Sequence, residues 1–192
     1  MNVSAHLIET ILSRWSDRTL IESPDSSLSF SRFFQKASLL SEKLETEPGD
    51  RVFLRSKDQV SLMVALWALW MRKSIAVPVN PSFPENRIWS LMSSCGSRFI
   101  LVSEEDFQEV PPEIKVSLPD SIPEKQTGIQ KNTFRTINPF QAAAVIFTSG
   151  SSGIPKGAVL SLANFCYSAL GANQQMSLCL LYTSDAADDV EC

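Results

Sequence analysis

The residues best suited to chemistry lie together at positions 148–157, where the chain reads Thr-Ser-Gly-Ser-Ser-Gly-Ile-Pro-Lys-Gly. This segment contains three glycines, four hydroxyl side chains and one lysine. Glycines allow consecutive backbone N–H groups to converge on one point, hydroxyls are donors that can rotate toward a ligand, and a lysine adds a positive charge. The segment therefore predicts a binding site for an oligophosphate.

The spacing differs from that of the common nucleoside-triphosphatase loop, which has four residues between its first two glycines and a Ser or Thr directly after its lysine. Here Gly150 and Gly153 are only three positions apart, and Gly157 follows Lys156. A flexible Gly/Ser linker is the other interpretation of such a run. We favour a phosphate-binding loop between a strand and a helix, because an apolar strand is expected at 142–147 and the segment ends in Pro155-Lys156-Gly157.

The elements that must position this segment follow from apolar periodicity and turn residues. Strands are expected at 19–22, 52–54, 75–79, 99–102 and 142–147, with short strands at 114–118 and 133–137 in a polar, proline-containing stretch. Helices are expected at 4–15, 30–45, 58–71 and 84–94, and from Ser161 or Asn164 to Gln174. Because strands and helices alternate, the predicted fold class is α/β, with a largely parallel sheet covered by helices.

Individual residues indicate where several of these elements begin or end. Ser29 is placed to cap the helix at 30–45, and Gly96 to stop the helix at 84–94. Pro84 suits the first turn of that second helix. Pro78 has no backbone N–H to donate, so it should lie at a strand end or on an edge strand. The helix at 58–71 is apolar nearly all the way round and should be buried.

The composition excludes several classes of protein. The chain has 192 residues, 44% hydrophobic and 20% charged, with a formal net charge of −4, so no strongly basic nucleic-acid-binding surface is expected. The single histidine, His6, argues against a His-rich metal site or a Ser/His/Asp triad. The longest apolar run, 60–71, has about twelve residues where a membrane span needs about twenty, so no integral membrane segment is predicted. The N-terminus lacks the basic region of a secretory signal, which predicts a cytoplasmic protein.

Residues 146–157 resemble the phosphate-binding signature of the adenylate-forming (AMP-binding) superfamily, which includes acyl-CoA synthetases, luciferases and the adenylation domains of peptide synthetases. Leu28-Ser29-Phe30 and the segments 48–52 and 75–81 resemble N-terminal landmarks of the same family. The resemblance implies that residues 1–178 are the truncated N-terminal part of such an enzyme's large domain. It also implies a loop that closes on the β- and γ-phosphates of ATP, formed by Thr148, Ser149, Gly150, Ser151, Ser152, Gly153 and Lys156.

Within the superfamily, the short N-terminus and residues 76–84 resemble the 2-succinylbenzoate:CoA ligases of menaquinone biosynthesis. Leu162 departs from the pattern, since relatives often carry a histidine or another ring there. The resemblance implies a ligase that uses ATP and Mg²⁺ to convert a small carboxylic acid into an acyl-adenylate, from which CoA then displaces AMP to form an acyl-CoA. The adenine pocket, the Mg²⁺ ligand and the catalytic lysine are expected beyond this chain. We therefore assign no catalytic residue and no metal ligand, and expect the chain by itself to be inactive.

Two other functions stay open at this point. One is an adenylation domain that loads its acyl group onto a carrier protein, and the other is a nucleotide-binding module without enzymatic activity. The sequence predicts no particular oligomeric state.

Residues 179–192 show neither helical nor strand periodicity and resemble the translation of a transposon-type sequencing adapter. We therefore expect them to be a non-native tail that follows the partial domain at 1–178. The tail carries four acidic residues and no basic one. The whole chain therefore has a net charge of −4, whereas residues 1–178 have a net charge of 0. Cys95 and Cys166 are then the remaining cysteines, and we expect both to be free thiols.

Overall fold

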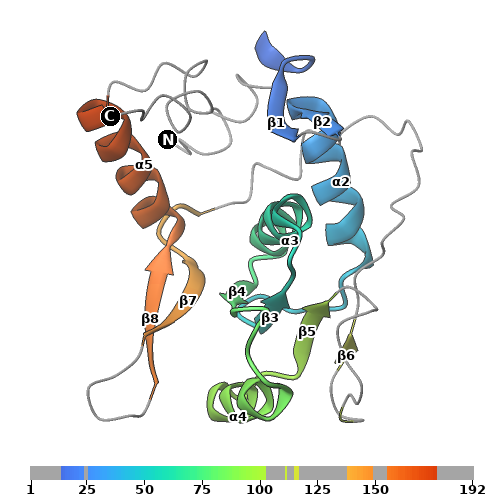
Figure 1. The fold of residues 1–192 in the computed structure, drawn as a ribbon, viewed down its shortest axis with the longest axis vertical. Helices are drawn as coiled ribbons and strands as arrows, with labels where there is room; N and C mark the ends of the chain where they lie inside the picture. Colours follow the sequence, from blue (N-terminus) through green and yellow to red (C-terminus); the bar gives the residue numbers. More distant parts are fainter. Residues whose placement is uncertain are drawn as a thin grey trace, which may run out of the picture.

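A six-stranded sheet forms the centre of the computed structural model, which describes residues 14–23, 26–102, 111, 115–116, 138–148 and 155–176 (Figure 1). The strand order is β6-β5-β3-β4-β7-β8. Neighbouring strands pair in parallel except β7 and β8, which are antiparallel, so the predicted α/β fold with a largely parallel sheet is confirmed. The strands are β3 (Arg51–Arg55), β4 (Ile75–Pro78), β5 (Phe99–Val102), β6 (Lys115–Val116), β7 (Ala142–Thr148) and β8 (Lys156–Ser161).

Helices cover both faces of this sheet. Figure 1 shows α3 and α4 on opposite sides of the strands, and each belongs to a separate apolar cluster. Successive side chains of a strand point to opposite faces. Val52 and Leu54 of β3 therefore pack in the cluster of α3, whereas Phe53 packs in the cluster of α4. The helices are α2 (Phe30–Lys43), α3 (Gln59–Met71), α4 (Glu85–Cys95) and α5 (Leu162–Met176).

The predicted helix boundaries are largely confirmed. The Ser29 hydroxyl accepts a hydrogen bond from the Arg32 backbone N–H at 3.4 Å and caps α2, which ends at Lys43, two residues before the expected end. Gly96 ends α4 in the left-handed conformation, with φ of 62°. Pro84 occupies the N-cap of α4, immediately before its first turn. Pro78 is the last residue of β4, so the missing N–H lies at a strand end as expected, although β4 is an interior strand.

One prediction about the neighbourhood of the phosphate segment is wrong. A strand, β8, follows this segment and pairs with β7 from Ala142 to Thr148, so the segment joins two antiparallel strands, and α5 begins only after β8. Lys156 and Gly157 accordingly belong to β8. The β8 side chains are exposed from Lys156 to Val159, which leaves no alternation of apolar and polar residues by which to recognise a strand.

A second strand was also not expected. Residues 28–30 were predicted only as a lead into the next helix, but β2 (Ser26–Ser29) pairs antiparallel with β1 (Thr19–Ser23) in a separate two-stranded sheet. The short strand expected at 114–118 is present as β6. The strand expected at 133–137, the tail at 179–192 and the helix at 4–15, apart from the helical residues Arg14 and Trp15, lie outside the described residues.

None of the helices in the described part of the chain combines the length and the apolar character needed to cross a bilayer.

Candidate functional site

The β7–β8 hairpin brings two of the predicted phosphate-binding residues together. Thr148 is the last residue of β7 and pairs in register with Lys156, the first residue of β8. The Thr148 Oγ1 donates a hydrogen bond to the Lys156 carbonyl oxygen at 3.3 Å, and both residues are exposed. Ser149, Gly150, Ser151, Ser152 and Gly153 lie outside the described residues, and their assignment stays a prediction.

The end of the hairpin next to the connecting segment packs closely on the protein core. Gly157 pairs with Phe147, and a Cβ atom at Gly157 would lie 2.8 Å from Val145 Cγ1, which is closer than van der Waals contact permits. The Phe147 ring lies 6.4 Å from the fully buried ring of Phe53, measured between centroids. A side chain at position 157 would therefore push β8 away from residues that connect the hairpin to the central strand β3.

The other end of the hairpin is held by α3 and α5. The Trp70 Nε1 of α3 donates to the Ala143 carbonyl oxygen of β7 at 2.9 Å, and the Trp70 ring lies 5.6 Å from that of Phe165 in α5. Leu162, the residue that departs from the family pattern, is 6% exposed and packs in the same apolar cluster as Trp70. Leucine suits this position because it lies inside the core.

The carboxyl ends of the parallel strands meet at one edge of the sheet, and ligands of open α/β sheets bind at that edge. β7 reaches this edge at Thr148, and β3 reaches it at Arg55. The Arg55 guanidinium donates from Nε and Nη2 to the Pro81 carbonyl oxygen at 3.0 and 2.8 Å. Arg55 thus connects the segment after β4 to the end of β3 and stabilises the conformation of this edge.

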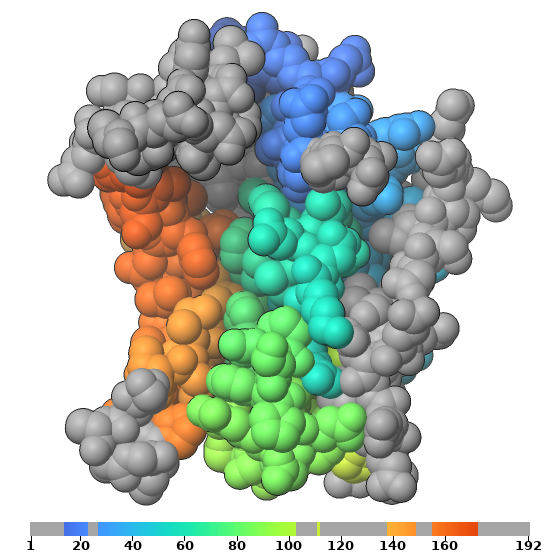
Figure 2. Space-filling view, viewed as in Figure 1, coloured from blue at the N-terminus to red at the C-terminus, as the bar shows by residue number. Residues whose placement is uncertain are grey.

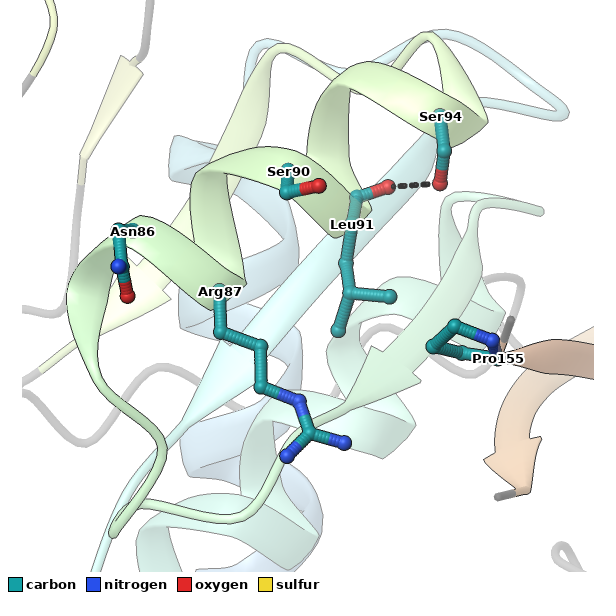
Figure 3. Close-up of a pocket in the computed structure, with 6 residues that line it drawn as sticks. All are labelled: Asn86, Arg87, Ser90, Leu91, Ser94 and Pro155. Carbon is teal, nitrogen blue, oxygen red and sulfur yellow. Dashed lines mark hydrogen bonds between the residues drawn. The ribbon is translucent and has the colours of Figure 1, made fainter. Parts of the chain in front are cut away.

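Sequence reasoning missed a pocket of about 470 Å³ between α4 and the start of β8 (Figure 3). Asn86, Ser90 and Ser94 are spaced four residues apart on α4, and this polar stripe was the available signal. The interpretation of this helix used only its apolar face, whose residues Ile88, Leu91 and Met92 are buried as expected. The lining residues are Asn86, Arg87, Ser90, Leu91, Ser94 and Pro155.

No three His, Cys, Asp or Glu side chains gather in the described ranges in a way that could hold a metal ion. The protein ligand of Mg²⁺, which is expected beyond this chain, stays a prediction. Cys95 and Cys166 are free thiols, as predicted.

Comparison with known proteins identifies one family. The family described as AMP-binding enzyme matches residues 8–190. Curated relatives include indigoidine synthase of Dickeya dadantii, which is 28% identical over 180 residues and covers 84% of this chain, and the nonribosomal peptide synthetase otaB of Aspergillus carbonarius, which is 34% identical over 151 residues and covers 75%. This chain spans only 12% and 8% of the length of those two proteins.

Two solved structures show the same fold. The nonribosomal peptide synthetase FmoA3 aligns over 91% of this chain and 19% of its own, with a TM-score of 0.70 and 18% identity. The O-succinylbenzoate coenzyme A synthetase of Bacillus subtilis, in complex with AMP, aligns over 90% of this chain and 46% of its own, with a TM-score of 0.69 and 15% identity.

Proposed function

Because the chain belongs to the AMP-binding enzyme family, we propose that it is the phosphate-binding part of an ATP-dependent ligase that activates a carboxylic acid. The observation that carries the proposal is the β7–β8 hairpin, which sets Thr148 and Lys156 at the two ends of a segment rich in glycines and hydroxyls. The hairpin begins at the carboxyl end of a parallel strand, where ligands of such sheets bind.

In the proposed reaction, a carboxylate oxygen attacks the α-phosphorus of ATP, and pyrophosphate leaves as the acyl-adenylate forms. The protein contributes positioning and stabilisation of the charge that moves onto the leaving phosphates. The Thr148 hydroxyl is one such donor, since it can rotate from the Lys156 carbonyl oxygen toward a phosphate oxygen. The Lys156 ammonium adds a positive charge at the same end of the hairpin. Mg²⁺ bound to the nucleotide would neutralise further phosphate charge, with protein ligands outside this chain.

The second half-reaction has two candidate thiols. Residues 76–84 favour CoA and an acid of the 2-succinylbenzoate type, because they resemble the corresponding ligases. The curated relatives favour a carrier-protein thiol, because their names include nonribosomal peptide synthetases. Supplying the intact enzyme with an acyl-adenylate and either CoA or a phosphopantetheinylated carrier protein separates the two, because the true acceptor alone yields a thioester at an appreciable rate.

The test of the shared first step is Thr148→Ala in the intact enzyme, assayed by acid-dependent release of pyrophosphate from ATP. We expect a loss of about 1–3 kcal/mol of transition-state stabilisation, which is the range for a charge-assisted hydrogen bond. Thr148→Ser retains a hydroxyl and serves as the matched control, and Ser152→Ala should resemble Thr148→Ala. Thioester formation from a presynthesised acyl-adenylate should change little, because pyrophosphate has already left.

Equal losses in both half-reactions would show that Thr148 acts through folding, and would contradict its role in phosphate binding. A preference for fatty acids or acetate over aromatic and dicarboxylic acids would contradict the 2-succinylbenzoate assignment. It would not contradict the proposed formation of an acyl-adenylate. The 192-residue chain alone should form no thioester and bind ATP weakly, because one phosphate loop cannot align carboxylate, α-phosphate and metal together.

A further inference from the structure

Strand β7 contains one residue more than β8 along the length over which they pair. Ala142 pairs with Ser161, and Ala144 pairs with Leu160. Ala143, between them, therefore has no partner of its own in β8. Such a β-bulge bends a strand and redirects the side chains that follow it. Ala143 and Ala144 both pack in the apolar cluster of α3, although successive side chains of a regular strand point to opposite faces, which agrees with a bulge at Ala143.

The bulge decides which residues pair at the end of the hairpin next to the connecting segment. Beyond the bulge, the register runs to the pair of Thr148 and Lys156. Without the bulge, the pairing that starts at Ala142 and Ser161 would continue in step to the end of β7, and Thr148 would lie opposite Pro155. A shift of one residue also turns every following side chain to the other face of the sheet. The pairing of Thr148 with Lys156 thus depends on the bulge.

The alanine run in β7 does not by itself specify a bulge. Residues 142–144 are all alanine, so these positions offer no difference in size or polarity that would favour a bulged strand over a regular one. Pairing with β4 adds little, because the register between β4 and β7 consists of one pair, Ala76 with Ala144. A contact from outside these strands is therefore expected to select the bulged form.

Trp70 of α3 supplies such a contact. Its Nε1–H donates to the Ala143 carbonyl oxygen at 2.9 Å, in the buried interior. The indole ring is restrained on two sides, since its centroid lies 5.2 Å from that of Trp67 and 5.6 Å from that of Phe165. Figure 2 shows α3 (teal) beside the hairpin and α5 (orange to red), the elements that these contacts join. Because Trp70 is 7% exposed, water competes little for this hydrogen bond.

We propose that Trp70 is a positioning residue for formation of the acyl-adenylate, because its indole N–H stabilises the bulge at Ala143 and so keeps Thr148 opposite Lys156. The inference rests on the proposed function, since the register matters for the reaction only if that pair binds phosphate. Trp70 acts near the first residue of β7, whereas Thr148 is the last, so the effect is transmitted by the strand. Loss of the N–H would favour the regular pairing, in which Thr148 lies opposite Pro155.

The first experiment measures the register of the hairpin in the 192-residue chain by cross-strand nuclear Overhauser effects between backbone protons. The unchanged chain should show the contact between Thr148 and Lys156. Trp70→Phe should lose this contact and gain one between Thr148 and Pro155. Trp67→Phe is the matched control, because Trp67 packs on Trp70 from the same helix, whereas the hydrogen bond to β7 belongs to Trp70. The control should keep the original contact.

A second variant separates the N–H group from the size of the ring. Replacement of Trp70 by benzothienylalanine, through genetic code expansion, keeps the fused two-ring shape and exchanges the N–H for a sulfur atom. This chain should fold like the unchanged one, and its register should shift as in Trp70→Phe. An unchanged contact between Thr148 and Lys156 in the benzothienylalanine chain would overturn the inference, whether or not Trp70→Phe folds.

The kinetic experiment uses the intact enzyme. Acid-dependent release of pyrophosphate from ATP should slow about tenfold with Trp70→Phe, the loss expected for one buried hydrogen bond, and less than about twofold with Trp67→Phe. Thioester formation from a presynthesised acyl-adenylate should change less than about twofold in both variants, because pyrophosphate has already left. Equal losses in both half-reactions with Trp70→Phe would show a merely structural role and would overturn the inference.

Comparison with Thr148→Ala separates this inference from the proposed function. A loss of pyrophosphate release with Thr148→Ala, together with an unchanged register and rate in Trp70→Phe, would overturn the inference and leave the proposed function intact. A shifted register in Trp70→Phe without any loss in Thr148→Ala would support Trp70 as the residue that sets the register. The same result would contradict the proposed role of the hairpin in phosphate binding.

Discussion

The centre of the sheet and the β7–β8 hairpin are built in opposite ways. Val52, Phe53 and Leu54 of β3 are 0–1% exposed, because helices cover both faces of the sheet there. In β8, by contrast, the residues from Lys156 to Val159 are exposed, and Val159 is 62% exposed. Burial on two faces gives the centre its stability. The exposed hairpin carries the groups that we propose to bind phosphate, so the proposed site lies at the edge of a buried scaffold.

The largest expected effect tests whether stability is concentrated in the central strands. Phe53→Ala should lower the free energy of unfolding by about 3–5 kcal/mol, because it removes a fully buried ring and leaves a cavity. Val159→Ala, the matched change in β8, should stay within about 0.5 kcal/mol. Urea unfolding measures both. Ile100→Val, expected at about 0.5–1.5 kcal/mol, is the milder core variant if Phe53→Ala does not fold. Similar losses of unfolding free energy for Phe53→Ala and Val159→Ala would show that stability is not concentrated in the central strands.

The next prediction concerns the contact where the hairpin meets the scaffold. Gly157→Ala should destabilise the protein by about 1–3 kcal/mol, because its new Cβ would lie 2.8 Å from Val145 Cγ1. Adding Val145→Ala should restore part of the loss, in a double-mutant cycle measured by thermal unfolding. Gly171→Ala in α5 is the control, since nothing lies within 4 Å of a Cβ there, and it should stabilise the helix by about 0.5–1 kcal/mol. An equal loss from Gly157→Ala with or without Val145→Ala would refute the steric explanation.

A smaller effect is expected at Asp58, which caps α3 just after the carboxyl end of β3. Its carboxylate accepts hydrogen bonds from the Ser61 and Val60 N–H groups at 2.8 and 3.2 Å. Hydrogen bonding from Ser61 is the main cause that lowers the Asp58 pKa below its ordinary value of 3.8. Asp58→Ala should cost about 1 kcal/mol of stability at neutral pH, because the cap is lost.

The pH dependence of this cap has a definite sign. Because the pKa of Asp58 is lowered in the folded state, the stabilisation by its carboxylate is complete above pH 3.8, the ordinary pKa. This stabilisation is lost as the pH falls through the lower pKa of the folded state. The difference between the unchanged chain and Asp58→Ala should therefore narrow in acid below 3.8. Asp58→Asn keeps a capping oxygen without the charge, so the stability that its cap contributes should not depend on pH. Urea unfolding across pH 2–7 is the measurement, and a difference that widens in acid would show that the carboxylate is not stabilising α3.

The smallest effect is expected from removal of residues 179–192. We propose that this polar, non-periodic segment is a non-native tail, so its deletion should leave the melting temperature unchanged within error. Differential scanning calorimetry of the two chains is the test. A clearly lower melting temperature for the shortened chain would show that the segment belongs to the domain, and that the scaffold extends beyond the elements described here.

Local signals predicted the scaffold well, and particular residues show why. The apolar face of α4 (Ile88, Leu91 and Met92) is buried, and Gly96 ends that helix, because helix periodicity and a left-handed stop depend on neighbours within a few positions. β8 was missed because its residues are held by backbone pairing with β7 and not by burial. Residue types predict a phosphate-binding segment, which stays a prediction, while the position of that segment between two antiparallel strands depends on pairing and was not predicted.

The sequence by itself determined which segments are helices or buried strands, and which residues bring hydroxyls, glycines and charge to the predicted phosphate-binding segment. These properties depend on composition and on spacing within one element. Only the tertiary structure decided the order β6-β5-β3-β4-β7-β8, the register that sets Thr148 beside Lys156, and the position of Pro155 and Arg87 around one pocket although they are more than sixty positions apart in the chain. Such contacts depend on hydrogen bonds and packing between distant residues, and many alternative pairings are compatible with the same local pattern.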